Sequence, residues 1–263
     1  MNILKIIQMK GKEPITVVTA YDYFSAKVCE RVGIDMILVG DSLGNVVLGY
    51  ESTLNVEMED MERHIQAVRR GAPNSFIIGD MPFMSYQTSD DEGMRNAGRL
   101  MKAGSNCVKV EGGLRVVPLV KKLVDSGIPV IGHIGLTPQS VNQIGGYRIQ
   151  GKGKDADRMI VAAKSLEEAG IFSLVIELTI EETARAITES LLIPTIGIGA
   201  GRYCDGQVLV WHDLLGINDG KISKFVKKYA NLNSEIEKAL SDYVKDVKGH
   251  MFPEENHVFK EDK

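Results

Sequence analysis

The stretch CVKVEGG, residues 107–113, combines an apolar strand pattern with two opposite charges. Side chains two positions apart in a strand point to the same side, so Lys109 and Glu111 are expected to share one face. Val108 and Val110 then share the other face. Burying a charge is costly unless it has a partner. The stretch therefore predicts a buried strand that ends at a polar site.

Short apolar runs of this kind recur along the whole chain, and most are continuously apolar, as strands covered on both faces are. They span residues 14–22, 35–41, 75–81, 107–111, 128–136, 172–178, 193–201 and 206–213. Segments with apolar residues at helical spacing lie between them, at 23–32, 57–70, 90–103, 115–126, 155–169 and 181–190. Alternating strands and helices indicate an α/β protein with a parallel sheet. Eight runs predict a (β/α)₈ TIM barrel, with a doubly wound open sheet as the competing architecture.

No long low-complexity linker interrupts this pattern, so residues 1–263 are interpreted as one barrel domain. Residues from about 221 to 263 depart from the pattern. They contain a charged amphipathic helix, NSEIEKALSDYVKDV, and a polar tail that ends in KEDK. We expect this helical segment to be peripheral and a candidate to dock on a neighbouring subunit.

The composition is that of an ordinary globular protein, with 44% apolar and 25% charged residues. A formal net charge of −4 disfavours broad binding to nucleic acids or anionic membranes. The three cysteines, Cys29, Cys107 and Cys204, are widely spaced and odd in number, which suits a reducing compartment better than a disulfide framework. The amino terminus lacks a signal-peptide pattern, and no stretch approaches membrane-spanning length. We therefore expect a cytoplasmic protein.

Acidic residues stand at the carboxyl-terminal ends of four apolar runs: Asp41, Asp80, Glu111 and Glu177. That end of a TIM barrel carries the active site. Any one of these acids could instead cap the helix that follows its strand. Capping does not explain the repetition at four runs, nor Lys109 inside a strand. The pattern predicts an active site at this end of the barrel.

The residue types at this end favour a hard metal ion, because there is no close spacing of histidine and cysteine residues. Carboxylate oxygens without soft ligands suit Mg²⁺, with Mn²⁺ as an alternative. Such an ion could chelate a 2-oxo acid and stabilise its enolate, while a further carboxylate removes the α-proton. His133 is a lone histidine in a strand, and such a residue is more often part of the core than a catalyst. We expect it to contact the acidic residues of the site rather than the substrate.

Two glycine-rich segments have weaker implications. The segment GGYRIQGKGKD, residues 145–155, is either a solvated loop or a mobile lid over the site. The segment GIGAG, residues 197–201, is not the GxGxxG fingerprint of dinucleotide sites, and it could simply allow the backbone to approach closely.

Taken in order, the motifs of the chain resemble those of the 3-methyl-2-oxobutanoate hydroxymethyltransferase family, also called ketopantoate hydroxymethyltransferases. The resemblance covers roughly residues 1–220 and includes no departure at the main polar positions. It is carried by TAYD (19–22), VGDSLG (39–44), RRGAP (69–73), GDMPF (79–83), VKVEGG (108–113), GHIGLTPQS (132–140), GGYRIQGKG (145–153), LVIE (174–177) and IPTIGIGAG (193–201).

The resemblance implies a barrel of the phosphoenolpyruvate/pyruvate type, assembled as a homodecamer. It implies transfer of a hydroxymethyl group from 5,10-methylenetetrahydrofolate to 3-methyl-2-oxobutanoate through a Mg²⁺-stabilised enolate. The products are 2-dehydropantoate, which leads to pantothenate and coenzyme A, and tetrahydrofolate.

The resemblance also implies roles for individual residues. It implies Mg²⁺ ligands at Asp41, Asp80 and Glu111. It implies substrate contacts at Asp41, Ser42, Asp80 and Lys109, and a general base at Glu177.

Three rival functions share parts of this pattern. One is a Mg²⁺-dependent lyase or mutase of the same barrel type. Another is a Schiff-base aldolase that uses Lys109 as nucleophile. The third is a non-catalytic 2-oxo acid sensor, which would need the ligand contacts but no base at Glu177.

Overall fold

The computed structural model describes residues 1–218, 220 and 222–261 of the chain. By its internal contacts the chain divides into two compact units, Met1–Trp211 and His212–Lys263. The last two residues of the polar tail and residue 221, where the carboxyl-terminal segment begins, lie outside the described residues. The single domain expected from the sequence stays a prediction.

The first unit is a closed barrel of eight parallel strands, in the order β1 to β8 with β8 paired to β1. The pairing of β8 with both β7 and β1 excludes the open sheet, and the predicted TIM barrel is confirmed. The strands are β1 Ile15–Thr19, β2 Met36–Val39, β3 Phe76–Asp80, β4 Cys107–Glu111, β5 Val130–Gly135, β6 Ser173–Glu177, β7 Thr195–Ile198 and β8 Gly206–Leu209.

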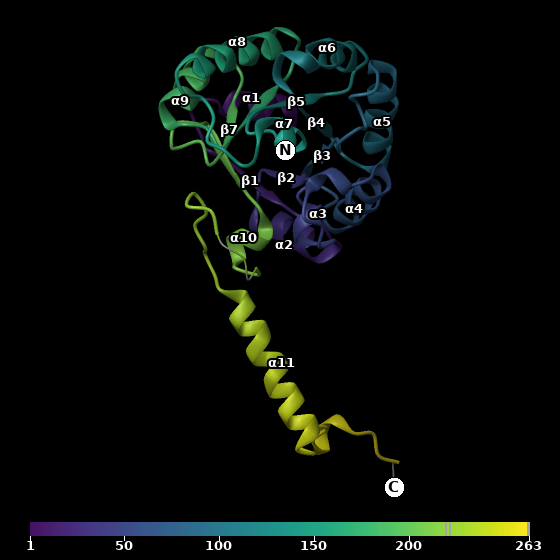
Figure 1. Cartoon of the computed structure of the whole chain (residues 1–263). Coiled ribbons are helices and arrows are strands. Elements are labelled where there is room, and N and C mark those ends of the chain that lie inside the picture. Colours follow the sequence, from purple (N-terminus) through teal and green to yellow (C-terminus); the bar gives the residue numbers. More distant parts are fainter. Residues whose placement is uncertain (219, 221, 262–263) are drawn as a thin grey trace. The chain divides into compact units, whose positions relative to one another are not determined.

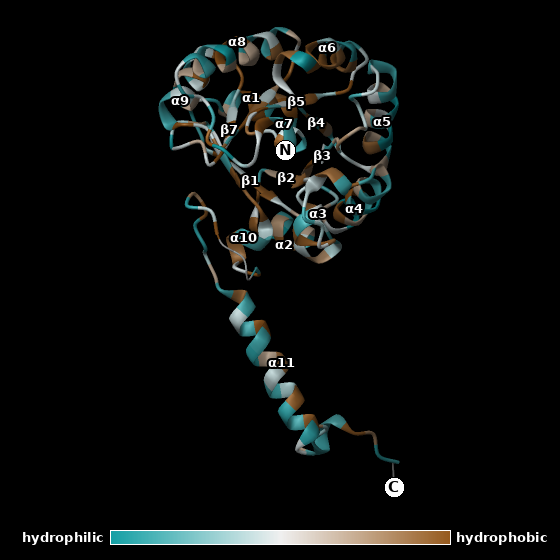
Figure 2. Cartoon of the chain, in the orientation of Figure 1, coloured by the Kyte–Doolittle hydropathy of each residue, from teal (hydrophilic) through white to brown (hydrophobic). Residues whose placement is uncertain are grey.

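Helices surround the strands, and their outer surfaces are largely hydrophilic while the strands are hydrophobic (Figures 1 and 2). The helices of this unit are α1 Ile3–Met9, α2 Tyr23–Val32, α3 Leu43–Val46, α4 Met58–Gly71, α5 Asp90–Ala103, α6 Val117–Asp125, α7 Val141–Ile144, α8 Lys154–Glu168 and α9 Glu181–Ser190. Helix α10, Trp211–Leu215, begins at the last residue of this unit, and its other residues belong to the second unit. Short 3₁₀ helices are η1 Thr53–Asn55, η2 Gly113–Val116 and η3 Pro138–Ser140. Among the described residues, no helix is both long and apolar enough to cross a membrane.

The barrel interior is filled by alternate residues of the strands, as the spacing in CVKVE predicted. Cys107 belongs to the interior cluster with Phe76, Ile78 and Ile131, whereas Lys109 and Glu111 follow on the same face toward the strand end. Lys109 is in register with the last residue of β3. The interior is therefore apolar near the strand starts and charged near the strand ends.

Helix α1 closes the end of the barrel where the strands begin, and it was not predicted from the sequence. Asn2 caps the helix by accepting a hydrogen bond from the Lys5 backbone N–H at 2.9 Å. Ile6 and Met9 are buried in the interior cluster, beside residues such as Ile15. A seven-residue amphipathic segment carries too little periodicity to be distinguished from a loop.

The second unit contains helix α11, Leu232–Lys248, followed by the 3₁₀ helix η4, Glu255–His257. Helix α11 matches the amphipathic helix expected there. Its apolar side chains lie three and four positions apart, so they form one stripe. They are exposed, namely Ile236, Leu240, Tyr243, Val244 and Val247.

Candidate active site

The four acids predicted from the sequence all lie at the carboxyl-terminal ends of the strands. Asp80, Glu111 and Glu177 are the last residues of β3, β4 and β6, and Asp41 follows β2 after Gly40. Because the strands are parallel, these ends meet at one end of the barrel, which we call the mouth. The spacing of acids along the chain thus becomes a cluster in space.

Lys109 forms the central ion pair of the mouth. Its Nζ donates a hydrogen bond to Asp80 Oδ1 at 2.5 Å, and both side chains are buried. Burial alone would lower the pKa of Lys109, but the negative charges of Asp80 and of the two other buried acids raise that pKa above its ordinary value. The amine is therefore protonated and is a poor nucleophile.

Asp41 adds negative charge that the lysine does not balance. Its backbone N–H donates to Asp80 Oδ2 at 3.0 Å, and its Oδ2 accepts a hydrogen bond from Gln139 Nε2 at 3.1 Å. Burial raises the pKa of Asp41 well above its usual value, and the charge of Asp80 raises it further. The mouth is an anionic centre with one ammonium group inside it.

His133 lies between two carboxylates. Its Nδ1 is 3.3 Å from Glu111 Oε2, and its Nε2 is 3.1 Å from Glu177 Oε2, although neither contact is aligned as a hydrogen bond. Burial and Lys109 lower the pKa of His133, but the two carboxylates outweigh them and raise it to about 9. The ring is a cationic neighbour of Glu177, which fits the supporting role expected for it.

Glu177 differs from the other acids in its access to solvent. Its side chain is 19% exposed, against 3% for Asp80 and for Glu111. The next residue, Leu178, has a positive φ of 43°, a conformation that residues other than glycine rarely adopt and that is often found at functional sites. A Cβ at Gly135, in register with Glu177, would lie 2.1 Å from the Glu177 carbonyl oxygen. The backbone around Glu177 is therefore held closely in place.

Ser42, the remaining residue singled out from the sequence, also lies at the mouth, directly after Asp41. Its Oγ is 2.8 Å from the Tyr21 hydroxyl, which follows the end of β1. This contact orients the Ser42 hydroxyl. The structure thus brings every residue predicted for the site to one end of the barrel.

Two neutral residues that organise the mouth were not predicted from the sequence. Gln139, in η3, is buried, and its backbone N–H donates to Glu111 Oε1 at 2.9 Å. Its Oε1 accepts from the Tyr86 hydroxyl at 2.8 Å. Both residues lie in loops, where charge and periodicity give no signal. The one available clue was a polar residue directly after Pro138, just beyond the end of β5.

Tyr147 belongs to the glycine-rich segment 145–155, and its side chain is exposed. Partial desolvation raises the pKa of its phenol, and the charges of Glu177 and Asp41 raise that pKa further. The middle of the segment is anchored, since the Gln150 backbone N–H donates to the Leu178 carbonyl at 2.8 Å. The loop is therefore fixed next to the end of β6 at Gln150 and carries the aromatic ring of Tyr147 three residues earlier.

The mouth fits a divalent cation in charge and donor type. Asp41, Asp80 and Glu111 supply buried carboxylates, and Glu111 Oε2 has no hydrogen-bond partner among the described residues. As the side chains stand, no group of three His, Cys, Asp or Glu residues in the described chain is arranged around a metal position. One reason is that Lys109 and Gln139 already occupy carboxylate oxygens. A cation would offset both the burial of Asp41 and the repulsion from Asp80, the two causes that raise the pKa of Asp41.

The sequence model of the ketopantoate hydroxymethyltransferase family matches residues 1–255. The chain belongs to this family. A 3-methyl-2-oxobutanoate hydroxymethyltransferase of Kosmotoga olearia is 60% identical over 261 residues, covering 99% of this chain and 98% of that protein. The enzyme of the same name from Thermotoga maritima is 58% identical over 260 residues, covering 98% and 96%. The resemblance seen in the motifs is confirmed.

Solved structures at low identity support the same fold. A 2,3-dimethylmalate lyase of the PEP mutase/isocitrate lyase superfamily aligns with a TM-score of 0.62 at 16% identity, covering 99% of this chain and 91% of that one. A phosphonopyruvate hydrolase determined with oxalate and Mg²⁺ aligns with a TM-score of 0.64 at 10% identity, covering 99% and 92%. At these identities, the similarity shows the shared barrel fold alone.

Proposed function

We propose that the chain transfers a hydroxymethyl group from 5,10-methylenetetrahydrofolate to 3-methyl-2-oxobutanoate, giving 2-dehydropantoate and tetrahydrofolate. This is the first step of pantothenate synthesis. Membership of the family and the names of its close relatives support the reaction. The observation that carries the mechanism is the contrast within the mouth. Three acids are buried around an ammonium group, and a fourth, Glu177, is partly exposed to solvent.

The buried part of the mouth is proposed to bind the 2-oxo acid. Lys109 is protonated, so it can pair with the substrate carboxylate, and the Ser42 hydroxyl can donate a hydrogen bond to it. Asp41, Asp80 and Glu111 would hold Mg²⁺, directly or through water. When bound, a divalent cation supplies positive charge to the keto oxygen and the carboxylate. Binding of this kind orients the substrate with its third carbon outward.

Glu177 is proposed to remove the proton from the third carbon of the substrate. That proton is acidified by the neighbouring carbonyl group, and a carboxylate that is partly exposed can reach it. His133 carries positive charge beside Glu177 and keeps the carboxylate in place. Removal of the proton leaves a nucleophilic carbon in the mouth.

That carbon is proposed to form a carbon–carbon bond with the one-carbon unit of the folate. Both bonds between this unit and the folate nitrogens N5 and N10 break. One water molecule supplies the hydroxyl group, and the proton removed from the substrate and the second proton of that water go to the two nitrogens. The chain therefore has to hold the 2-oxo acid and the folate side by side.

The proposal is tested with purified protein, 3-methyl-2-oxobutanoate, methylenetetrahydrofolate and Mg²⁺, by following formation of 2-dehydropantoate. A lyase or mutase would turn over without folate, and a sensor would bind the 2-oxo acid without turnover. Borohydride reduction in the presence of substrate distinguishes a Schiff-base aldolase, because only that enzyme would gain substrate mass at Lys109.

Binding of Mn²⁺ to protein without substrate, followed by electron paramagnetic resonance, tests the metal site independently of activity.

We also propose that the chain forms a homo-oligomer. The exposed apolar stripe of helix α11 supports this, because such stripes are commonly buried against a partner. Light scattering on the purified chain tests the proposal. Replacing Leu240 and Val244 with serine should reduce the measured mass, with Lys238→Ser on the same helix as control.

A further inference from the structure

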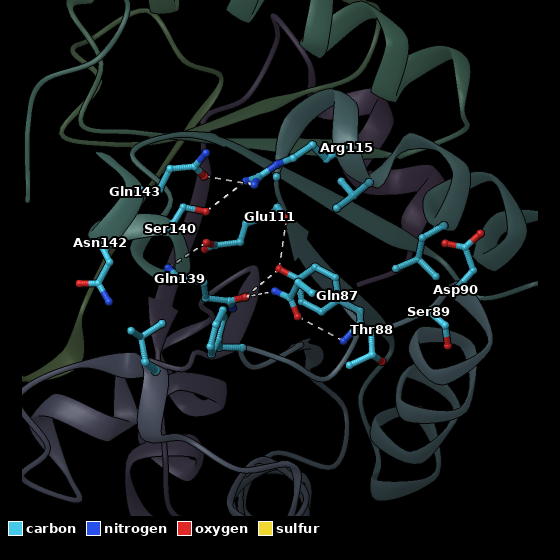
Figure 3. A pocket seen from close by; sticks show the side chains of 16 residues that line it. Gln87, Thr88, Ser89, Asp90, Glu111, Arg115, Gln139, Ser140, Asn142 and Gln143 are labelled. Atoms are coloured by element: carbon cyan, nitrogen blue, oxygen red, sulfur yellow. Dashed lines mark hydrogen bonds between the residues drawn. The ribbon is translucent and has the colours of Figure 1, made fainter. Parts of the chain in front are cut away.

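A cavity of about 650 Å³ lies beside the mouth, between the loops that follow β3, β4 and β5 (Figure 3). It is too large for a five-carbon 2-oxo acid and falls in the size range of drug-sized ligands. Its buried floor is formed by side chains that include Tyr86, Val116 and Leu119. Its exposed rim carries amides and hydroxyls, at Gln87, Thr88, Ser89, Asn142 and Gln143.

The cavity shares a wall with the acid cluster. Glu111 and Gln139 both line it. On the other side, Gln139 Nε2 donates to Asp41 Oδ2, and on the cavity side its Oε1 accepts from Gln87 Nε2 at 3.0 Å. One glutamine side chain thus separates the cavity from Asp41. A ligand in the cavity lies next to a substrate in the mouth.

The rim also carries a cation that no carboxylate neutralises. The Arg115 guanidinium donates to Ser140 Oγ at 3.1 Å and to Gln143 Oε1 at 3.4 Å, both of them neutral acceptors. Among the described residues it forms no ion pair, unlike Lys122 nearby, which pairs with Asp90 at 2.9 Å. The cavity therefore suits a ligand with a flat, largely apolar body, hydrogen-bonding edges and an anionic group.

We propose that this cavity binds the folate co-substrate, with the pterin ring against the apolar floor and a glutamate carboxylate at Arg115. This inference rests on the proposed function, which requires a one-carbon donor beside the 2-oxo acid. A pterin is a flat ring with donors and acceptors along one edge, and amide side chains such as Gln87 and Asn142 can match both kinds of group. The shared wall places the carrier of the one-carbon unit next to the reacting carbon.

Two variants test the site, each at an exposed position so that folding is preserved. Arg115→Gln removes the cation, and Asn142→Trp fills the rim. The matched control is Lys121→Gln, an exposed lysine of α6 outside the cavity. Loss of one charge-assisted hydrogen bond should raise KM for methylenetetrahydrofolate about tenfold in Arg115→Gln. Asn142→Trp should raise it further, and the control should match the wild type.

A second readout separates this inference from the proposed function. Exchange of the hydrogen on the third carbon of 3-methyl-2-oxobutanoate with deuterium needs the mouth but no folate. In both variants the effect on KM for folate should exceed the effect on exchange. A KM for folate equal to that of the control would overturn the cavity assignment. If the wild type neither exchanges the hydrogen nor forms product, the proposed function fails. Calorimetric titration of tetrahydrofolate then still decides whether folate binds the cavity, because the wild type should bind it more tightly than Asn142→Trp.

Discussion

The two ends of the barrel each contain a lysine–aspartate pair, but only one of the pairs has its charges balanced. Where the strands begin, Lys10 Nζ lies 3.0 Å from Asp205 Oδ2. Asp205 also accepts hydrogen bonds from the backbone N–H groups of Gly11 and Thr195, at 3.0 and 2.9 Å. Every oxygen of that carboxylate has a partner, and the pair ties the closing helix to the barrel.

At the mouth, the Lys109–Asp80 pair is accompanied by further buried acids. Burial raises the pKa of Asp41, and the charge of Asp80 raises it further. One Glu111 oxygen has no hydrogen-bond partner among the described residues. A pair that only supported the fold would not need these extra charges. The difference between the two ends indicates that polar burial at the strand starts serves stability, whereas at the mouth it prepares a site for ligands.

The largest expected effect at the mouth comes from Glu177→Gln. The substitution keeps the shape of the side chain and removes the proton acceptor, so kcat should fall about 10²–10⁴-fold. KM for 3-methyl-2-oxobutanoate should change little, because the buried residues that bind it remain. Steady-state kinetics measure both values. A variant that turned over like the wild type would remove Glu177 from the mechanism.

Exchanging the two lysines for alanine compares the pairs directly. Lys109→Ala should lower kcat/KM about 10–100-fold, the value of a hydrogen bond to a charged group. Lys109→Arg should retain more activity, because it keeps the charge in a different geometry. Lys10→Ala should leave kcat/KM near that of the wild type and lower the midpoint of urea unfolding. Equal activity losses in the two alanine variants would contradict the division between the ends.

Replacing Asp205 and replacing Asp80 should lower the free energy of unfolding by different amounts. Asp205→Asn should lower the free energy of unfolding by about 1–3 kcal/mol, because it weakens several partly buried hydrogen bonds of this carboxylate. Asp80→Asn should cost less in metal-free protein, because it also removes repulsion from Asp41 and Glu111. Denaturant titration followed by circular dichroism measures both. A larger loss in Asp80→Asn would show that the mouth is not under electrostatic stress.

The smallest expected effect concerns the loop that carries Tyr147. Chymotrypsin can cut at Tyr147, which is exposed near the mouth, and at Leu192, which is exposed in the loop between α9 and β7. If residues 145–154 close over bound ligands, substrate and folate together should slow cleavage at Tyr147 and leave Leu192 unaffected. Mass spectrometry of the fragments gives both rates. Equal rates at Tyr147 with and without ligands would exclude a lid.

The fold could be predicted from the sequence because its strands are buried on both faces and separated by amphipathic helices. All eight strands fall inside the predicted apolar runs, and α2, α5 and α9 begin and end at the predicted residues. The charged residues of the mouth could also be predicted from the sequence, since parallel strands bring their last residues together. Helix α1 was missed because it is short, and its role depends on contacts with residues far along the chain.

The neutral part of the site could not be predicted in the same way. Gln139 and Tyr86 act through hydrogen bonds between different loops, and loop conformation is not encoded in hydrophobic periodicity. The cavity beside the mouth depends on how these loops pack. Only the three-dimensional structure reveals that one glutamine side chain separates it from Asp41.

The central claim is that the mouth binds a 2-oxo acid with a divalent cation while Glu177 removes the proton from its third carbon. Deuterium exchange at that carbon, measured by nuclear magnetic resonance without folate, tests this claim most directly. We predict exchange by the wild type with Mg²⁺, little exchange after removal of metal with a chelator, and little exchange by Glu177→Gln. Exchange at the wild-type rate in metal-free protein or in Glu177→Gln would contradict the account.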